Sequence, residues 1–197
     1  MVGSAHHHSE IENPMIENLL NENSFEIEFA KNLFSLECLA SKQYFSYEEE
    51  KFIVGISSCW SFIREYITTS DDILSIRFIS DLHEILATQI GAPNPGKFVD
   101  DGAEPGLWSD LEVALKEIIE EFGACENCYV IAQLFWGRHL PNLQLSVGWL
   151  CINALALRYG YSPPFYPPKN IHEELLDCLE CAGPDCWDAE SLRALIG

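Results

Sequence analysis

The sequence predicts an all-α fold, in which a helical bundle surrounds one central buried helix and carries one short β-hairpin. Apolar residues recur at helical spacing in segments along the chain. No strand pattern alternates with these segments, which excludes a doubly wound sheet. The segment from about Leu143 to Tyr159 is apolar on every side. A helix without a polar face is packed on all sides, so we expect this one at the centre of the bundle.

Three helices are expected before the hairpin. The first spans about 25–39, where four apolar residues follow helical spacing: Phe25, Phe29, Leu33 and Leu36. The second runs from about Tyr47 to Tyr66, and Ser46 with Glu49 three residues later matches a capping box. The third runs roughly from Ile73 to Ile90 after the capping sequence "TTSDD". Its apolar stripe consists of Ile76, Ile79, Leu82, Ile85 and Leu86.

The stretch 91–106, "GAPNPGKFVDDGAEPG", interrupts the helices with proline and glycine and predicts the hairpin. Further helices are expected at 108–122, 125–136 and 143–159, and Gly160 with the prolines of "YSPPFYPP" should end the last of these. Two short acidic helices should follow at 171–181 and 188–195. We therefore expect a flexible N-terminal segment over 1–24 and a single helical domain over 25–197.

The chain is strongly acidic, with 11 Lys and Arg residues against 31 Asp and Glu and a formal net charge of −20. Such a surface repels nucleic-acid phosphates and anionic lipids, so we expect neither nucleic acid nor membrane as a partner. Charge favours a basic protein partner. No apolar run reaches the length of a membrane span, and "MVGSAHHHSEIENP" lacks the apolar core of a cleaved signal peptide. The expected location is the cytoplasm, although a secretion signal of the non-cleaved type would not be visible.

The eight cysteines should be reduced thiols, because no export signal is present. Three of them lie in apolar sequence surroundings and should act as small apolar residues: Cys38, Cys59 and Cys151. The pairs "CENC" and "CLEC" leave a structural zinc site open as an alternative, since two such spacings are typical of zinc ligands. These pairs are Cys125 with Cys128, and Cys178 with Cys181. We favour thiols carried on helices and expect no bound metal.

Two segments carry a resemblance to a known family. "RHLPNLQLS" at 138–146 leads directly into "VGWLCINALALRYGYSPP", and "ISDLHEILATQIGAPNPGKFVDDG" lies upstream. Over 71–168 the chain resembles the Fic (Fic/Doc, or Fido) family, whose loop His-Pro-Phe-x-Asp/Glu-Gly-Asn-Gly-Arg precedes a buried helix. The helix letters that match are Gly148, Leu150, Asn153, Leu155, Leu157, Arg158, Gly160 and Tyr161. The resemblance implies a Fic-like helical bundle with a flap, and an enzyme that moves AMP from ATP, with magnesium, onto a protein hydroxyl.

The chain departs from the family at the catalytic base and at the metal ligand. Arg138 stands where the resemblance places the catalytic histidine, and a guanidinium does not accept a proton near neutral pH. A slip of one residue would bring His139 to that position. Asn142 replaces the acidic magnesium ligand and is a weaker, uncharged one.

The chain also departs from the family at the phosphate-binding loop. The phosphate-loop positions are Asn142, Leu143, Gln144 and Leu145, and the last three replace Gly-Asn-Gly. Glycines there let the backbone close on phosphates, and leucine side chains would crowd an anion. Ser146 and Trp149 stand where the family has arginines.

The flap positions implied by the resemblance are Gly96, Lys97, Phe98 and Val99. In the family the flap edge holds a target segment by strand addition, and His83 should orient or pack beneath it. We therefore expect a pseudoenzyme, a Fic-like domain that binds a protein partner and no cofactor. The alternative is an active Fic-type nucleotidyltransferase or phosphotransferase that uses ATP and Mg. Its catalytic candidates are Arg138, His139 and Ser146.

Overall fold

The computed structural model describes residues 24–41, 46–70, 74–99, 140–158 and 169–181. These residues form the helices α2 (Ser24–Ala40), α3 (Glu49–Thr69), α4 (Ile76–Ile90), α7 (Gln144–Arg158) and α8 (His172–Cys181), with the 3-10 turn η2 (Lys169–Ile171) before α8. No strand occurs within these ranges. The all-α class is therefore confirmed for the described part of the chain.

Helices α2, α3 and α4 pack against one another in sequence order, α2 on α3 and α3 on α4. The apolar stripe expected on α2 is buried at Phe29, Leu33 and Leu36, each with 0% of its surface exposed. Phe29 meets Trp60 of α3 edge-on, with ring centroids 5.5 Å apart. Burial of each such side chain contributes about 1.5–3 kcal/mol. The hydrophobic periodicity of the sequence therefore produces this part of the core directly.

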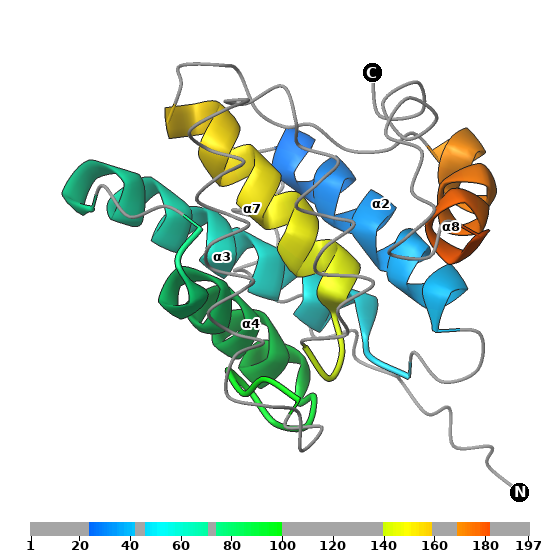
Figure 1. Cartoon of the computed structure of the whole chain (residues 1–197), viewed down its shortest axis with the longest axis horizontal. Helices are drawn as coiled ribbons and strands as arrows, with labels where there is room; N and C mark the ends of the chain where they lie inside the picture. The colour runs from blue at the N-terminus through cyan, green and yellow to red at the C-terminus, as the bar shows by residue number, and fades with distance from the viewer. Residues whose placement is uncertain (1–23, 42–45, 71–73, 100–139, 159–168, 182–197) are drawn as a thin grey trace, which may run out of the picture.

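Helix α7 is the central helix that the sequence predicts. Every residue from Leu145 to Ala156 is buried, and the helix contacts α2, α3 and α4. In Figure 1, α7 crosses the middle of the group, with α2 and α8 beyond one side of it and α3 and α4 on the other. A helix packed in this way has no solvent face, which explains why it lacks a polar stripe.

The predicted start of the second helix was wrong. Helix α3 begins at Glu49, and its N-cap is Glu48, with φ −74° and ψ 127°, whose side chain makes no capping hydrogen bond. Ser46 and Glu49 therefore do not form a capping box. Tyr47 lies before the helix begins and is partly buried against the core. The helix also continues beyond Tyr66 to Thr69.

The predicted N-terminal cap of the third helix was also wrong, although the predicted end of this helix at Ile90 was correct. Helix α4 begins at Ile76, and Ser75 caps it by accepting a hydrogen bond from the Phe78 N–H at 3.1 Å. Leu74 has a left-handed backbone, φ 68°, through which a right-handed helix cannot continue. At the other end Gly91, φ 74°, supplies the left-handed cap after Ile90 that glycine tolerates best.

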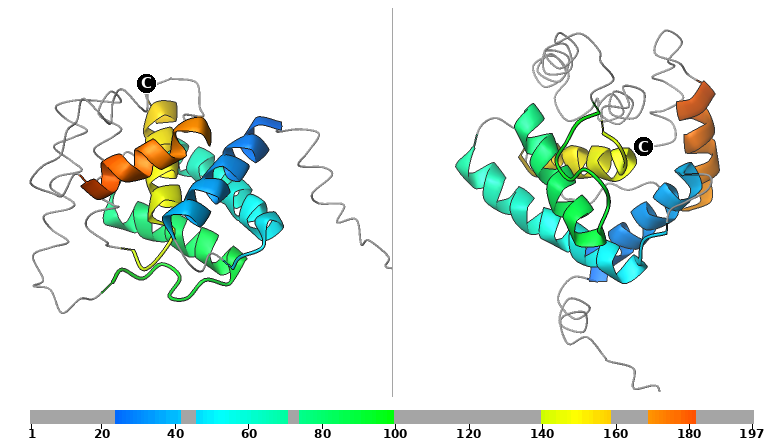
Figure 2. Two further views of the ribbon diagram at one scale, coloured as in Figure 1. Left: turned by 90° about the vertical axis from the view of Figure 1, so that its right-hand side faces the viewer. Right: turned by 90° about the horizontal axis from the view of Figure 1, so that it is seen from below.

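Residues 91–99 run from the end of α4 without forming a strand, and they lie beside the segment that leads into α7 (Figures 1 and 2). The Ser80 hydroxyl of α4 donates to the Gly96 carbonyl at 2.7 Å, which ties this loop to the helix. Gly96 has φ 65°, and a Cβ there would lie 3.0 Å from the Glu84 Cβ. The loop therefore requires glycine at this position for both reasons. The second half of the expected hairpin, 100–106, lies outside the described residues, so the hairpin stays a prediction.

Helix α8 agrees with the acidic helix expected at 171–181 and packs against α2. The other expected features lie outside the described residues: the N-terminal segment, the helices at 108–122, 125–136 and 188–195, and the Gly160 cap. Within the described ranges, no helix is both long enough and apolar enough to cross a membrane.

Candidate functional site

The segment just before α7 is the region where the resemblance places a phosphate-binding loop. Leu143 has a left-handed backbone, φ 59°, and its carbonyl accepts the N–H of Val147 at 2.9 Å, so it forms the first turn of the helix. Left-handed geometry is ordinary for glycine and costs a leucine roughly 1–2 kcal/mol. The backbone thus adopts a glycine-type conformation, but it carries a bulky side chain. Leu143 and Leu145 are both buried, with 2% and 1% of their surfaces exposed.

A carboxylate from α2 binds the first turn of α7. Glu37 Oε1 accepts a hydrogen bond from the Ser146 N–H at 2.8 Å and a second from the Ser146 hydroxyl at 2.7 Å. Amide groups in the first turn of a helix have no partner within the helix and carry partial positive charge, so they bind anions. In this protein the anion position belongs to a side chain of the protein itself.

The Glu37 side chain is almost completely removed from solvent. Only 6% of its surface is exposed, and Ser146 is fully buried. Burial raises the pKa of Glu37 above its ordinary value of 4.5, while the two hydrogen bonds from Ser146 act in the opposite direction. Burial disfavours the charged carboxylate, whereas the N–H and O–H donors favour it. Glu37 therefore functions as a buried cap for α7 rather than as a solvent-facing acid.

His83 of α4 links the 91–99 loop to the start of α7. Its Nδ1 accepts the Gly96 N–H at 3.0 Å, and its Nε2 lies 3.1 Å from Asn142 Oδ1. The Asn142 amide group also donates to the Pro93 carbonyl at 3.3 Å. His83 therefore packs against the 91–99 loop as expected, while the flap itself stays a prediction.

The hydrogen bonds define the protonation state of His83. Because Nδ1 accepts a backbone N–H, it carries no proton, and Nε2–H is the donor to Asn142. The ring is fully buried, and this burial lowers its pKa below 6.5, although the Asn142 hydrogen bond acts in the opposite direction. His83 is thus a neutral structural connector in the native state.

Several sequence-predicted site residues lie at or near this region. The Gln144 amide donates to the Leu140 carbonyl at 2.6 Å, so it closes the turn before α7. Trp149 is buried, and its Nε1 has no hydrogen-bond partner among the described residues. Arg138 and His139 lie outside the described residues, so their roles as base or loop residues stay predictions.

The flap positions occupy the loop after α4. The Lys97 N–H donates to the Asn94 carbonyl at 3.2 Å, and the Lys97 side chain is exposed. Phe98 is partly buried and packs against the core, and Val99 is half-buried. The loop therefore anchors itself through Phe98 and presents Lys97 to solvent.

The sequence analysis missed Glu37, which organises the start of α7. Ser146 follows it by 109 residues, so no local pattern connects the two. One signal was available, since Glu37 directly follows the buried Leu36 on the apolar side of α2. An acidic residue in such a stripe is rarely fully buried unless it is paired.

The described cysteines differ in their burial. Cys59 and Cys151 are fully buried, and this burial raises the pKa of both thiols, as expected of small apolar residues. Cys38 is half-buried. Within the described ranges, no group of three His, Cys, Asp or Glu side chains could hold a metal ion. The "CENC" pair lies outside those ranges, so a zinc site stays an untested alternative.

No protein-family model matches this sequence, and the curated proteins contain no match. The resemblance to Fic proteins therefore rests on the quoted segments alone.

Proposed function

We propose that this chain is a degenerate Fic-like domain that lacks adenylyltransferase activity and binds a protein partner. The Glu37–Ser146 contact carries the proposal. A nucleotide phosphate at the start of α7 would need the Ser146 N–H that Glu37 already occupies. An ionised Glu37 would also repel it, because two anions do not share one buried site without a cation between them.

Steric considerations support the same proposal. Leu143 and Leu145 are buried where the resemblance places glycines, so a triphosphate would have to displace side chains of the core. Asn142 Oδ1 already accepts a hydrogen bond from His83, and its NH₂ group donates to the Pro93 carbonyl. An amide engaged at both ends is a poor replacement for a magnesium-binding carboxylate. These residues do not fit a magnesium–nucleotide complex.

The 91–99 loop is the surface proposed for partner binding. Lys97 is exposed there, and Gly96 has no side chain that would obstruct an approaching segment. The overall charge of −20 attracts basic partners at long range, which increases association rates. The resemblance supplies the flap as the place of contact, and the loop's ties to α4 and α7 would hold it ready for binding.

A thermal-shift measurement tests the loss of nucleotide binding. We expect the melting temperature of the full chain to be the same with and without ATP and MgCl₂. A ligand at a hundred times its Kd would stabilise the fold by about 2.7 kcal/mol, which raises the melting temperature of a chain this size by several degrees. An upshift that requires both ATP and Mg would overturn the proposal and favour the enzyme alternative.

A partner-capture experiment tests the loop. Phe98 packs against the core, so replacing it would perturb folding as well as binding. Lys97→Glu is the better variant because this side chain is exposed. Lys169→Glu, at an exposed lysine of η2, makes the same charge change elsewhere. Because the proposed partner is basic, we expect Lys97→Glu to increase ATP-independent capture and Lys169→Glu to leave it unchanged. Equal capture by both variants would remove the loop as the binding surface.

A further inference from the structure

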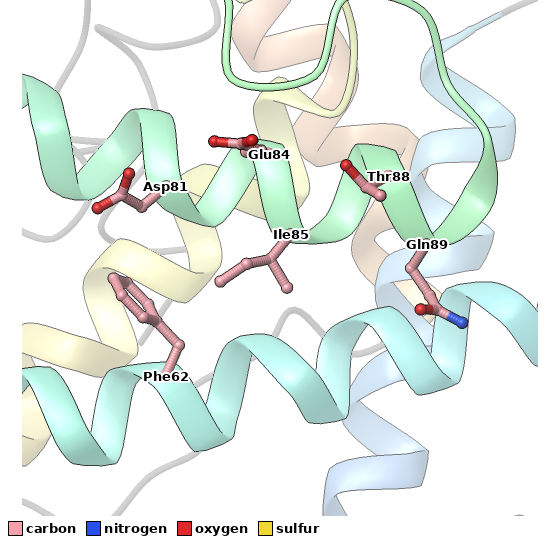
Figure 3. Close-up of a pocket in the computed structure, with 6 residues that line it drawn as sticks. All are labelled: Phe62, Asp81, Glu84, Ile85, Thr88 and Gln89. Atoms are coloured by element: carbon pink, nitrogen blue, oxygen red, sulfur yellow. The ribbon is translucent and has the colours of Figure 1, made fainter.

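A groove of about 390 Å³ runs along the seam between α3 and α4. It shares no residue with the site at the start of α7. Its lining residues are Phe62 from α3 and Asp81, Glu84, Ile85, Thr88 and Gln89 from α4 (Figure 3). This volume is at the lower end of the range for small-ligand pockets, which suits one long side chain.

The groove follows from how the two helices approach each other. At Gly55 they are close, because a Cβ added there would lie 2.7 Å from Leu86 Cδ1 and 3.3 Å from the Gln89 Cβ. Farther along α3 the interface residue is Phe62, a large ring that stacks on Phe78 with centroids 5.7 Å apart. The seam is therefore closed at the glycine and leaves a groove beside the ring.

The groove combines an apolar floor with an acidic rim. Phe62 and Ile85 are each half-buried, so part of both side chains faces the groove. Figure 3 shows Ile85 and Gln89 projecting from α4 toward α3, Asp81 lying beside α4, and the Phe62 ring rising from α3 toward α4. Glu84 lies along the edge of α4 that faces away from α3, and its Oε2 would lie 3.2 Å from a Cβ on Gly96 of the 91–99 loop.

We propose that this groove binds an arginine side chain of a protein partner. The methylene groups of arginine would cover Phe62 and Ile85, and its guanidinium would lie between the carboxylates of Asp81 and Glu84. A planar guanidinium pairs with carboxylates through two parallel hydrogen bonds and stacks on aromatic rings, so arginine suits this groove better than lysine. The inference rests on the proposed function for the premise that the chain binds a protein, and it names a second surface and the chemistry of its ligand.

Arg77 of this chain shows that a guanidinium group is attracted to the acidic rim of the groove. Arg77 Nε lies 3.9 Å from Asp81 Oδ2, at the edge of the groove, and the Arg77 side chain is 87% exposed. An ion pair this exposed contributes little, so an incoming arginine can displace it. Glu84 is exposed and forms no ion pair with the described cations. Among the described residues, at least one carboxylate of the rim therefore has no ion-pair partner and can meet a ligand.

The test uses the full chain, labelled with ¹⁵N, and three peptides that differ at one position. The first is acetyl-Ala-Ala-Arg-Ala-Ala-amide. The second carries citrulline, which has the shape of arginine without the charge, and the third carries norleucine, which has only the apolar stem. We expect saturable amide shifts around Phe62 and Glu84 with the arginine peptide. Binding of the citrulline peptide should be about fivefold weaker, since exposed ion pairs contribute factors of this size.

Variants of the rim make the test specific. Asp81→Asn with Glu84→Gln should weaken arginine-peptide binding by about fivefold, as loss of the guanidinium charge does. Arg77→Gln removes the internal competitor and should strengthen it. Glu173→Gln with Glu174→Gln, exposed on α8, makes the same change in charge and should have no effect. Equal binding of the citrulline peptide, equal loss in the α8 variant, or shifts that map outside the groove would each overturn the proposal.

The two proposals fail separately. If no peptide perturbs the groove, the arginine site is excluded, while the ATP thermal-shift test of the proposed function is unaffected. If ATP and Mg raise the melting temperature, the proposed function is overturned, while a charge-dependent arginine site on α3 and α4 still stands.

Discussion

The Glu37 carboxylate accepts both the backbone N–H and the hydroxyl of Ser146, and so joins α2 to the first turn of α7. Both donors are buried, so the contact contributes to stability mainly by preventing two unpaired polar groups. The same contact occupies an amide in the first turn of α7, where a helix end would bind an external anion. Structure and proposed loss of nucleotide binding therefore depend on the same pair of residues.

Two replacements of Glu37 distinguish the effect of its hydrogen bonds on stability from the effect of its charge. Glu37→Ala leaves the Ser146 N–H and hydroxyl unpaired and should reduce the free energy of unfolding by about 2–4 kcal/mol. Glu37→Gln keeps an acceptor oxygen without burying a charge, and it should stay within about 1 kcal/mol of the wild type. Urea denaturation of the three proteins measures the difference. Equal losses in both variants would show that the contact with Ser146 is not what stabilises the helix start.

The contribution of Glu37 to the free energy of unfolding should decrease as the pH rises. Its folded pKa is raised above 4.5, so the folded state holds its proton to higher pH than the unfolded chain. Its contribution to stability is therefore fully present below pH 4.5 and is lost as the pH rises through the folded pKa. Glu37→Gln should remove this loss. A wild-type curve parallel to that of Glu37→Gln above pH 4.5 would contradict the buried, desolvated state of Glu37.

The contribution of His83 to the free energy of unfolding should instead decrease as the pH falls. Its folded pKa is lowered below 6.5, so the unfolded chain binds a proton first as the pH falls. Stability is fully present above pH 6.5 and should fall by up to about 1.4 kcal/mol per pH unit until the folded pKa is passed. His83→Gln should remove this slope, which the difference between the two urea-denaturation curves over pH 5–7 would isolate. A difference that does not change with pH would show that His83 is not buried as a neutral ring.

Leu143 offers a test of its left-handed backbone. Leu143→Gly relieves the strain of φ 59°, which Leu143→Ala retains, so the glycine variant should be the more stable of the two by about 1 kcal/mol. Leu150, buried in the middle of α7, is the matched control. There glycine should be less stable than alanine by about 1 kcal/mol, because glycine disfavours a helix interior. The same order of stability at both positions would contradict the left-handed turn.

The close approach at Gly55 is tested by adding a methyl group. Gly55→Ala would place a Cβ 2.7 Å from Leu86 Cδ1, and the required shift in a packed core costs about 1–3 kcal/mol. This cost should exceed the gain in helix propensity of about 1 kcal/mol. Ser58→Ala, at an exposed position of the same helix, should change stability by less than about 0.5 kcal/mol. Thermal or urea denaturation of both variants measures this, and a stabilised Gly55→Ala would mean that the helices are farther apart.

The parts of the fold that the sequence predicted are those with a strong local pattern. The central position of α7 follows from its lack of any polar face, and the end of α4 follows from Gly91. The helix starts were less predictable, because several neighbouring residues can act as caps. Tyr47 is partly buried just before α3 and Leu74 is left-handed just before α4, and the local sequence pattern shows neither feature.

The candidate site was only partly predictable for the same reason. The replacement of glycines by Leu143 and Leu145 was visible in the sequence, and so was the place of His83 beneath the loop. The carboxylate that fills the helix end was not, because Glu37 lies far from Ser146 along the chain. The groove could not be predicted from hydrophobic periodicity. Ile85 belongs to the apolar stripe of α4, which predicts full burial, but it is only half-buried. Spacing along one helix does not indicate how closely a second helix covers it.

One imidazole bonds to both Gly96 and Asn142, and this has a mechanical consequence. A partner that pulls the 91–99 loop away from α4 must break the bond to His83, and the released ring then loses its fixed orientation toward the entrance of the central helix. Force applied at the loop would thus reach the start of α7 by two routes, through the His83 ring to Asn142 and directly from Pro93 to Asn142.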